Sequence, residues 1–307
     1  MTTGYYSHPD CLLHEMGPHH PECSERLEAM EDQLILARID GFLRRMEAPL
    51  ATEEDLLLVH SRSHVDYVRE HAPQSGYYAI DADTTMNSAT WRAALRSAGG
   101  AVAAVDAVMR GDLDNAFCAA RPPGHHAEPD RAMGFCFFNN VAIAAHHAVE
   151  RHGLQRVVVI DFDVHHGNGT EAAFRDDPNV LMCSFFQHPF YPYSGADAPA
   201  QNMINLPMPA YTTGLQVREA IDMLWLPRLH AFQPELLVIS AGFDAHREDD
   251  LGQMGLVEAD YAWITGQLMD IAKRYAQGRI VSCLEGGYNL SALARSVVAH
   301  LRVLADI

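Results

Sequence analysis

The sequence predicts an α/β protein with a parallel sheet that is covered by helices on both faces. Short apolar runs alternate with longer helical stretches along the whole chain, as they do in proteins built from β–α–β units. The strand-like runs are residues 4–7, 116–120, 157–161, 180–186, 236–241 and 279–285. The helical stretches are residues 24–37, 89–109, 139–151, 215–229, 258–275 and 290–304.

The strand-like runs are assigned in chain order from their apolar content. GYYS and AFCAA come first, and VVVID is short, apolar and rich in β-branched residues. VLMCSFF, LLVISA and RIVSCLE follow, and LLVISA stays apolar up to Gly242, which opens the chain. Residues 167–169 and the proline-rich residues 188–209 are predicted to be loops. No linker rich in Gly, Pro or Ser divides the chain, so residues 1–307 are predicted to form a single domain.

Composition and charge narrow the class of protein. No apolar run approaches the ~20 residues of a membrane span, and the N-terminus lacks the pattern of a signal peptide, so a cytoplasmic protein without a membrane partner is expected. The 40 acidic and 22 basic residues give a net charge of −18. This charge argues against a nucleic-acid partner. It either attracts cationic substrates or only maintains solubility, and the sequence does not indicate the oligomeric state.

The six cysteines give no sign of a metal site or a disulfide framework. No two of them are spaced as CxxC. Cys118, Cys183 and Cys283 lie in apolar strand-like runs, where a reduced cysteine behaves as a small hydrophobic residue. Cys136 is close in sequence to the histidine pair described below, but a buried structural thiol is the preferred interpretation.

Carboxylates and a histidine gather at two predicted strand ends. Asp161, Asp163 and His165 alternate at the end of one run and are therefore predicted to share one face of a strand. Asp244 follows the apolar run 236–241 in the same way. Ligands of open α/β sheets bind beyond the carboxyl ends of the strands. Two carboxylates and one imidazole make a three-ligand set, and catalytic zinc uses three protein ligands and keeps one position for water.

Two further motifs supply groups for proton transfer. His125 and His126 follow a Pro-Pro-Gly bend, so both imidazoles can face a cavity. A neutral histidine near a metal-bound water can take its proton and later give that proton to a leaving amine. Tyr288 follows Glu285 and two glycines, which we interpret as a flexible turn, and its hydroxyl could donate to a developing oxyanion. The alternative for the histidine pair is a purely structural role.

Five separated motifs together resemble the zinc-dependent histone deacetylase family, in particular its class II branch and bacterial relatives. The motifs are HPECSERL, RPPGHHAEPDRAMGFCFFNN, DFDVHHGNGT, SAGFDAHREDDLGQM and LEGGYN. They occur in the family's order and span nearly the whole chain. The resemblance implies the arginase–deacetylase fold, an eight-stranded parallel sheet between helix layers, and an amidohydrolase that removes acetyl or related acyl groups from lysine side chains.

The resemblance also implies a role for each polar residue of the site. His126 would be the general base and later the general acid, with Asn168 as its partner; many class I members have Asp at that position. His125 would accompany Asp161 and stabilise charge, and Tyr288 would polarise the acyl carbonyl. The metal ligands implied are Asp163, His165 and Asp244. Zinc is expected, although iron(II), cobalt or manganese also suits such a donor set.

Other residues resemble the family's substrate-binding positions. Phe135 and Tyr191 correspond to two aromatic walls of an acyl-lysine tunnel, with ordinary core aromatics as the alternative interpretation. Gly134 would let a substrate amide approach the backbone. Arg26 resembles an arginine near an acetate-release pocket, with a surface helix position as the alternative. Leu251 stands where polyamine-selective relatives carry Glu.

Structural potassium is also implied by the resemblance. The first site would be formed by Asp161, Asp163, His165 and Ser184 with backbone carbonyls. A second, weaker match is formed by Phe174, Asp177 and Val180.

Three functions remain open at this point. The preferred one is zinc-dependent deacylation of an acylated lysine in a peptide or protein. An acetylpolyamine deacetylase, which would act on an acetylated small amine, is the first alternative, and Leu251 argues against it because it cannot pair with a distal ammonium. A non-catalytic acyl-lysine binding protein is the second, and the complete set of motif residues argues against it. An arginase-like hydrolase would require extra Asp and His ligands, which the sequence lacks.

Overall fold

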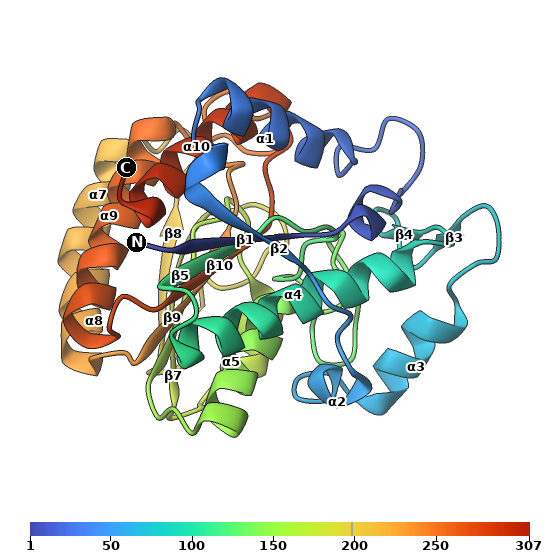
Figure 1. Ribbon diagram of the computed structural model, residues 1–307, viewed down its shortest axis with the longest axis horizontal. Coiled ribbons are helices and arrows are strands. Elements are labelled where there is room, and N and C mark those ends of the chain that lie inside the picture. Colours follow the sequence, from blue (N-terminus) through green and yellow to red (C-terminus); the bar gives the residue numbers. More distant parts are fainter. Residues whose placement is uncertain (198) are drawn as a thin grey trace.

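The computed structural model describes residues 1–197 and 199–307, and a sheet of eight parallel strands runs through it (Figure 1). The order across the sheet is β2-β1-β5-β10-β9-β6-β7-β8, and every neighbouring pair is parallel. The strands are β1 (Thr3–Ser7), β2 (Leu43–Glu47), β5 (Asn115–Cys118), β6 (Val157–Asp161), β7 (Val180–Gln187), β8 (Met203–Met208), β9 (Leu236–Ala241) and β10 (Ile280–Leu284). A separate small hairpin pairs β3 (Tyr78–Ala79) with β4 (Thr85–Met86). The eight-stranded parallel sheet that the sequence led us to expect is confirmed.

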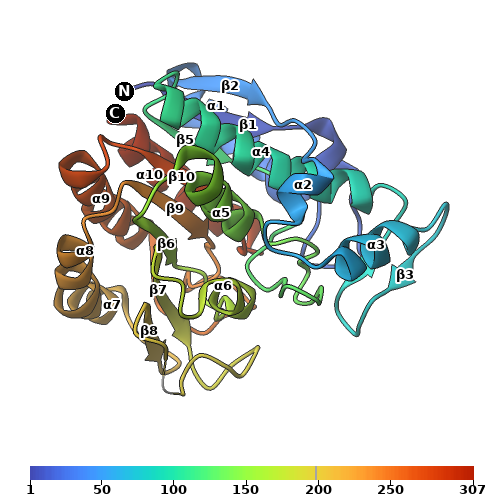
Figure 2. The same ribbon diagram turned by 90° about the horizontal axis from the view of Figure 1, so that it is seen from below.

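Helices cover both faces of the sheet (Figures 1 and 2). One face carries α1 (Glu25–Leu36), α7 (Gly214–Ala220), α8 (Leu226–Phe232), α9 (Glu258–Tyr275) and α10 (Leu290–Ala305). The other carries α4 (Thr90–Arg110) and α5 (Asn140–His152). The remaining helices are α2 (Glu53–Leu56), α3 (Arg62–Glu70) and α6 (Asn168–Phe174), with short 3₁₀ turns at Pro9–Leu12 and Asp40–Phe42.

The two helix layers enclose two separate hydrophobic cores. Alternate residues of a strand point to opposite faces, and β6 shows the consequence. Val158 and Ile160 pack in the core beneath α1, α9 and α10, whereas Val157 and Val159 pack beneath α4 and α5. All five residues of β6 are buried, as is typical of a central strand in a doubly covered parallel sheet.

Two strands of the eight-stranded sheet were not predicted, and both lie at its edges. The short hairpin strands β3 and β4 were not predicted either. β2 reads LRRME, and most of its side chains remain solvent-accessible, so it has no apolar run. β8 lies within residues 188–209, which were predicted to be a loop, and that prediction was wrong for Met203–Met208. β8 contains Pro207, which cannot donate to a strand ladder, and proline is tolerated mainly on edge strands.

All six predicted helical stretches are helical, whereas α2, α3 and α6 were not predicted. Residues 215–229 are helical throughout, but a π-helical turn at Ile221–Trp225 lies between α7 and α8. Residues 168 and 169 were predicted to be in a loop but begin α6. Local capping explains the position of α5: the Asn139 side chain accepts from Ala142 N, and the helix stops at Gly153, whose φ is +70°.

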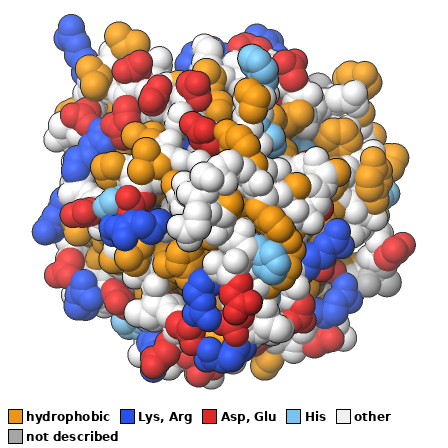
Figure 3. Space-filling model, turned by 90° about the vertical axis from the view of Figure 1, so that its right-hand side faces the viewer, with side chains coloured by type: hydrophobic (Ala, Val, Ile, Leu, Met, Phe, Trp, Pro, Cys, Tyr) orange, Lys and Arg blue, Asp and Glu red, His pale blue; other side chains and the backbone are white. Residues whose placement is uncertain are grey.

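The carboxyl ends of the central strands carry the loops that hold the predicted site residues. β5, β10, β9 and β6 are neighbours, so their following loops emerge side by side at one edge of the sheet. Figure 3 shows this side of the molecule, with hydrophobic and histidine side chains near its centre and charged side chains around them. None of the helices in the described part of the chain has the length and apolar content needed to cross a bilayer.

Helix α4 contains a glycine that no larger residue can replace without a shift of the backbone. A Cβ atom at Gly99 would collide with backbone atoms of Pro49 and Ala51. We expect Gly99→Ala to lower the free energy of unfolding by about 1–3 kcal/mol, the usual cost of overpacking. Gly266→Ala in α9 is the matched control, because a Cβ there meets nothing within 4 Å; it should raise stability by ~0.5–1 kcal/mol. Urea unfolding of both variants measures the difference, and equal effects would contradict this account.

Candidate active site

Asp163, His165 and Asp244 converge at the carboxyl ends of β6 and β9. The two strands are paired, with Asp161 opposite Ser240, so the loops that follow start side by side. One donor atom from each of the three residues lies within 4.8 Å of the others, and all three residues are largely buried. His165 Nδ1 lies 3.0 Å from Asp163 Oδ1 and 3.2 Å from Asp244 Oδ2.

The prediction that Asp161, Asp163 and His165 share one strand was wrong, because β6 ends at Asp161. Two consecutive turns bend the chain beyond it. Asp163 N donates to Asp161 Oδ1 at 3.1 Å, and His165 N donates to Asp163 Oδ1 at 2.9 Å. Asp side chains commonly accept from a backbone N–H two residues later. The turns therefore place Asp163 and His165 in the loop, where both approach Asp244.

The three residues have the donors and the surroundings of a metal site. Asp244 Oδ2 is buried and, although His165 Nδ1 lies 3.2 Å away, it accepts no well-aligned hydrogen bond from the described residues. The loops leave room for the carboxylates only because they carry glycine: a Cβ on Gly242 would strike the Asp163 side chain, and one on Gly286 would strike those of Asp163 and Asp244. Two carboxylates and one imidazole form a set that suits Zn²⁺ or a related divalent ion. The residues present therefore fit a bound metal.

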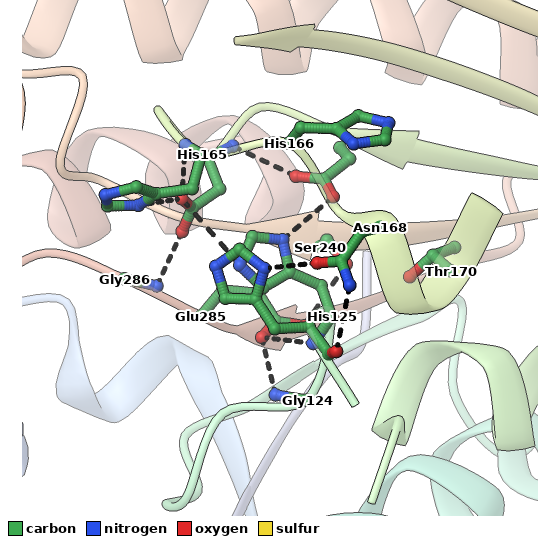
Figure 4. A network of polar contacts seen from close by, with 12 residues as sticks. Gly124, His125, His165, His166, Asn168, Thr170, Ser240, Glu285 and Gly286 are labelled. Atoms are coloured by element: carbon green, nitrogen blue, oxygen red, sulfur yellow. Dashed lines mark hydrogen bonds and ion pairs between the residues drawn. The ribbon is translucent and has the colours of Figure 1, made fainter. Parts of the chain in front are cut away.

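Glu285 holds the histidine pair against this cluster (Figure 4). Its Oε2 accepts from Gly124 N at 2.7 Å and from His125 N at 3.1 Å, and its Oε1 accepts from Ser240 Oγ at 3.1 Å. The segment around Glu285 also contacts the cluster through its backbone, because Gly286 N donates to Asp163 Oδ2 at 2.8 Å; the flexibility expected of this turn stays a prediction. Strand ends far apart in sequence are thus joined by one buried carboxylate.

The two histidines have different partners. His125 Nδ1 lies 3.0 Å from Asp161 Oδ2, and His126 Nδ1 lies 2.8 Å from Asn168 Oδ1. Asn168 Nδ2 donates to Glu128 Oε1 at 2.8 Å, which orients the amide so that its oxygen faces His126. An oxygen acceptor requires a hydrogen on His126 Nδ1, so Nε2 carries the lone pair.

Local charge drives the pKa values of the two histidines in opposite directions. Burial lowers the pKa of His126 well below its ordinary value, and the neighbouring His125 and His165 add to the effect. Burial also disfavours the charged form of His125, but Asp163, Asp161 and Glu285 outweigh it and raise the pKa of His125. The pair therefore combines one neutral imidazole with one cationic imidazole.

The carboxylates of the cluster also differ. Burial raises the pKa of Asp244 to about 7, and the charge of Asp163 adds to that effect. Burial likewise raises the pKa of Glu285 to about 7. This crowding of buried negative charge is the electrostatic environment in which a cation is stabilised.

A cavity of about 230 Å³ opens above the cluster. The rings of Phe135 and Tyr288 meet edge to face, with centroids 5.9 Å apart, and the Tyr191 ring meets that of His126 edge to face at 5.2 Å. Gly134 has a φ of +57°, and a Cβ there would collide with the His126 ring. The residues that line this cavity are Asp83, His126, Gly134, Phe135, His165, Phe190, Tyr191, Asp250, Leu251 and Tyr288.

The rim of this cavity contains residues that were not predicted. Asp83 and Asp250 line it together with Leu251, so the rim carries two carboxylates. Asp249 lies just behind: its Oδ1 accepts from Leu251 N at 3.0 Å, and its Oδ2 accepts from Tyr288 N at 2.6 Å. One carboxylate thus fixes the backbone of both Leu251 and Tyr288.

Arg26 is not a surface residue, and it is absent from the lining of the cavity. It is fully buried, and its guanidinium carbon lies 5.0 Å from the centroid of the Tyr288 ring. Its Nε donates to Gly287 O at 2.7 Å. Arg26 therefore supports the Tyr288 loop from behind. The position near an acetate-release pocket that the resemblance implies for Arg26 stays a prediction.

The expected cation-binding residues have different surroundings. Ser184 on β7 is paired with Asp161, and its buried Oγ has no hydrogen-bond partner among the described residues. The carbonyl oxygens of Phe174, Asp177 and Val180 do converge, but Asn202 Nδ2 donates to all three at 2.7–3.1 Å. A side-chain amide therefore lies where a second potassium ion was expected.

His166, next to His165 in the chain, points away from the cluster. Its Nδ1 lies 2.8 Å from Ser194 Oγ, and its Nε2 lies 2.9 Å from Glu171 Oε2. These contacts tie the loop that carries Tyr191 to helix α6, which carries Asn168.

Comparison with known proteins identifies the family. A model of the histone deacetylase domain matches residues 20–304, so the chain belongs to the histone deacetylase family. A histone deacetylase-like amidohydrolase of Pseudomonas aeruginosa is 36% identical over 311 residues, covering 94% of this chain and 82% of that protein. The polyamine deacetylase HDAC10 of Mus musculus is 39% identical over 304 residues, covering 92% of this chain but only 44% of that protein.

A solved structure shows the same fold. The HDA15 HD domain has a TM-score of 0.94 and 34% sequence identity, covering 99% of this chain and 90% of that one. The architecture is the arginase–deacetylase fold, and the protein is a hydrolase that acts on amide bonds. The alternative of a non-catalytic acyl-lysine binding protein is therefore set aside.

Arg26 belongs to a buried ionic network centred on Glu22. Glu22 Oε1 accepts from Arg26 at 3.1 Å, and Oε2 accepts from Arg121 at 2.6 Å; all three side chains are fully buried. Burial raises the pKa of Glu22, but the charge of Arg121 outweighs it, together with those of His14 and Arg26, and brings the pKa to about 2. Loss of one partner of a buried pair leaves the other charge uncompensated.

We expect Glu22→Gln to lower the free energy of unfolding at pH 7 by ~3–5 kcal/mol. Because the pKa of Glu22 is lowered on folding, its contribution is complete above the unfolded pKa and disappears as the pH falls towards 2. The difference between wild type and variant should therefore shrink below pH ~4.5. Urea unfolding at pH 7, 4 and 3 tests this, with Glu28→Gln on the exposed side of α1 as the control. A difference that does not change with pH would contradict it.

Proposed function

We propose that this protein is a zinc-dependent deacylase that removes acetyl or related acyl groups from lysine side chains. The observation that carries the proposal is a buried cluster of three metal-type donors, one of which, His165, lines an aromatic-walled cavity together with His126 and Tyr288. Asp163, His165 and Asp244 would hold the ion. Bound there, Zn²⁺ would polarise the acyl carbonyl and lower the pKa of a water molecule.

His126 is the proposed general base. Its Nδ1–H is committed to Asn168, so Nε2 is free to accept a proton from the attacking water. The same Nε2–H can then be passed to the amine nitrogen as its bond to the acyl carbon breaks. The products are a carboxylic acid and a free amine. The proton that His126 Nε2 takes from water is the one that it gives to the amine nitrogen.

His125 and Tyr288 are proposed to stabilise charge. The raised pKa of His125 keeps a positive charge beside Asp161, close to where negative charge develops. Burial raises the pKa of Tyr288 well above its ordinary value, so its phenol keeps the proton that an oxyanion would accept as a hydrogen bond. Arg26, beneath the Tyr288 ring, would hold that phenol in position.

Phe135 and Tyr191 are proposed to grip the methylene chain of the substrate between them. The walls are apolar, and the cavity volume of about 230 Å³ suits a chain of this thickness. Gly134 at the wall leaves the backbone accessible to the substrate amide. For the cations, we propose that Ser184 with Asp161, Asp163 and His165 binds a structural K⁺, which is supported by the unpartnered Ser184 Oγ.

Deacetylation of polyamines is the second candidate function, and the cavity rim favours it more than the sequence did. Leu251 itself cannot pair with an ammonium, which was the reason for preferring lysine. Asp83 and Asp250 nevertheless line the same cavity and supply carboxylates at its mouth. A turnover screen of the purified protein decides between them. It compares acetyl-, propionyl- and longer acyl-lysine peptides with acetylated polyamines, before and after treatment with a chelator.

Asp244→Asn should lower both metal content and turnover, because it removes an anionic ligand from a buried site. Elemental analysis of the dialysed protein measures the bound ion. Asp270→Asn, on the exposed side of α9, is the matched control and should keep both. A variant that retains its zinc at the wild-type level would show that Asp244 is not a ligand.

His126→Ala should lose turnover while it keeps its metal and its fold. A single acid–base group contributes ~10²–10⁴-fold in rate, and the metal donors remain in place. The measurement is kcat in a zinc-loaded sample with its metal content checked in parallel. Near-normal kcat would remove His126 from the mechanism.

The rim should decide between lysine and polyamine substrates. Leu251→Glu should improve kcat/KM for acetylated polyamines by several-fold, because a partly exposed ion pair contributes ~1 kcal/mol or less. Asp250→Asn should reduce it by a similar factor. If wild type already prefers acetylated spermidine, Leu251 is not the determinant and the carboxylates of the rim are.

A further inference from the structure

A second group of metal-binding side chains lies outside the candidate active site, between helices α4 and α5. The two helices pack side by side on one face of the sheet (Figure 2). Asp106 is one turn from the end of α4, and His147 and His152 lie in the last turns of α5. None of the three residues contributes to the cavity or to the networks around Asp163.

The three side chains converge on one point. His147 Nε2 and His152 Nε2 each lie 2.8 Å from the same oxygen, Asp106 Oδ1. One donor atom from each residue lies within 4.8 Å of the others. His147 is largely buried, whereas Asp106 and His152 retain 35% and 22% of their side-chain exposure. The group is therefore held by the fold on one side and open to solvent on the other.

The local charge suits a cation. Arg110, the nearby basic side chain on α4, forms its ion pair with Asp112 and not with Asp106. The C-terminal ends of helices carry partial negative charge, and both helices end close to this group.

Hydrogen bonds alone also account for part of this arrangement, since one carboxylate oxygen can accept from two imidazole N–H groups. In that state His147 Nδ1 is buried without a partner among the residues the structure describes. With a metal on Nε2, the hydrogen would move to Nδ1, which would again be unpaired. The two tautomers thus leave the same nitrogen unsatisfied, so the hydrogen bonds of His147 do not favour one of them over the other.

We infer that Asp106, His147 and His152 bind a divalent transition-metal ion, with solvent completing its coordination. Two imidazoles and a carboxylate suit Zn²⁺, Co²⁺, Ni²⁺ or Cu²⁺ better than Ca²⁺ or Mg²⁺, which prefer oxygen ligands. The ion would clamp the ends of α4 and α5 together. Because it binds the folded protein, it would also stabilise it in proportion to its concentration and affinity.

Metal counting with matched variants tests the site. Tag-free protein is stripped with a chelator and dialysed against micromolar Co²⁺ or Zn²⁺. Wild type should bind two ions per chain, and Asp106→Asn and His152→Ala should bind one each and keep their deacylase turnover. Asp106→Asn still accepts both histidine hydrogens, so it separates loss of the metal from loss of the hydrogen bonds. His230→Ala, an exposed histidine on α8, should bind as wild type does.

Two further samples separate this site from the active site. Asp244→Asn should retain one ion, and the double variant Asp106→Asn with Asp244→Asn should retain none. Zinc should raise the melting temperature of Asp244→Asn but not that of the double variant. Loss of Asp106 should weaken binding at this site by more than the ~10–100-fold that removal of an outer-shell partner costs.

The inference fails if Asp106→Asn binds as many ions as wild type, whatever Asp244→Asn does. It also fails if the second ion of wild type binds only at millimolar concentration, which would mark adventitious binding. If Asp244→Asn alone leaves the count unchanged, the proposed active site is wrong and the α4–α5 site still stands.

Discussion

Four carboxylates, those of Asp161, Asp163, Asp244 and Glu285, lie buried at the ends of three neighbouring strands. A buried ion without partners costs several kcal/mol, so the surrounding chain must supply donors or a counter-ion. Backbone N–H groups of Gly124, His125 and Gly286 are among these donors. Gly242 and Gly286 also leave the space that the carboxylates of Asp163 and Asp244 occupy. The architecture of the active-site edge follows from this requirement.

The same buried carboxylates also explain why His125 and His126 differ in charge and in proposed role. His125 faces an anion and becomes cationic, whereas His126 faces an amide and stays neutral. The difference originates in Asp161 and Asn168, which the end of β6 and the start of α6 place opposite the two rings. A single strand-to-helix connection thus selects both a charge stabiliser and a proton acceptor.

The sheet and most of the residues of the candidate site could be predicted from the sequence, and each incorrect or missing prediction has a specific physical cause. Asp163, His165 and Asp244 were recognisable because apolar runs end just before them, yet the strand stopped earlier than expected because Asp side chains turned the chain. The role of Glu285 could not be foreseen, since its partners Gly124, His125 and Ser240 lie tens to more than a hundred residues away. β8 (MINLPM) was missed because Asn205 and Pro207 interrupt its apolar residues and because it lies in a proline-rich segment that was interpreted as a loop. Glu128 and Asp249 act through residues that were predicted, and only three-dimensional contact links them.

Asp249 connects two properties that are usually considered separately. Its two oxygens hold the backbone of Leu251 at the cavity rim and of Tyr288 beside the reaction centre. A change in the conformation of the rim loop that admits a new substrate therefore also moves Asp249, which holds the backbone of Tyr288. Side-chain exchanges at position 251 avoid this penalty, whereas insertions or deletions around Asp249 do not. The substrate range of this scaffold is thus easier to diversify by substitution than by changes in loop length.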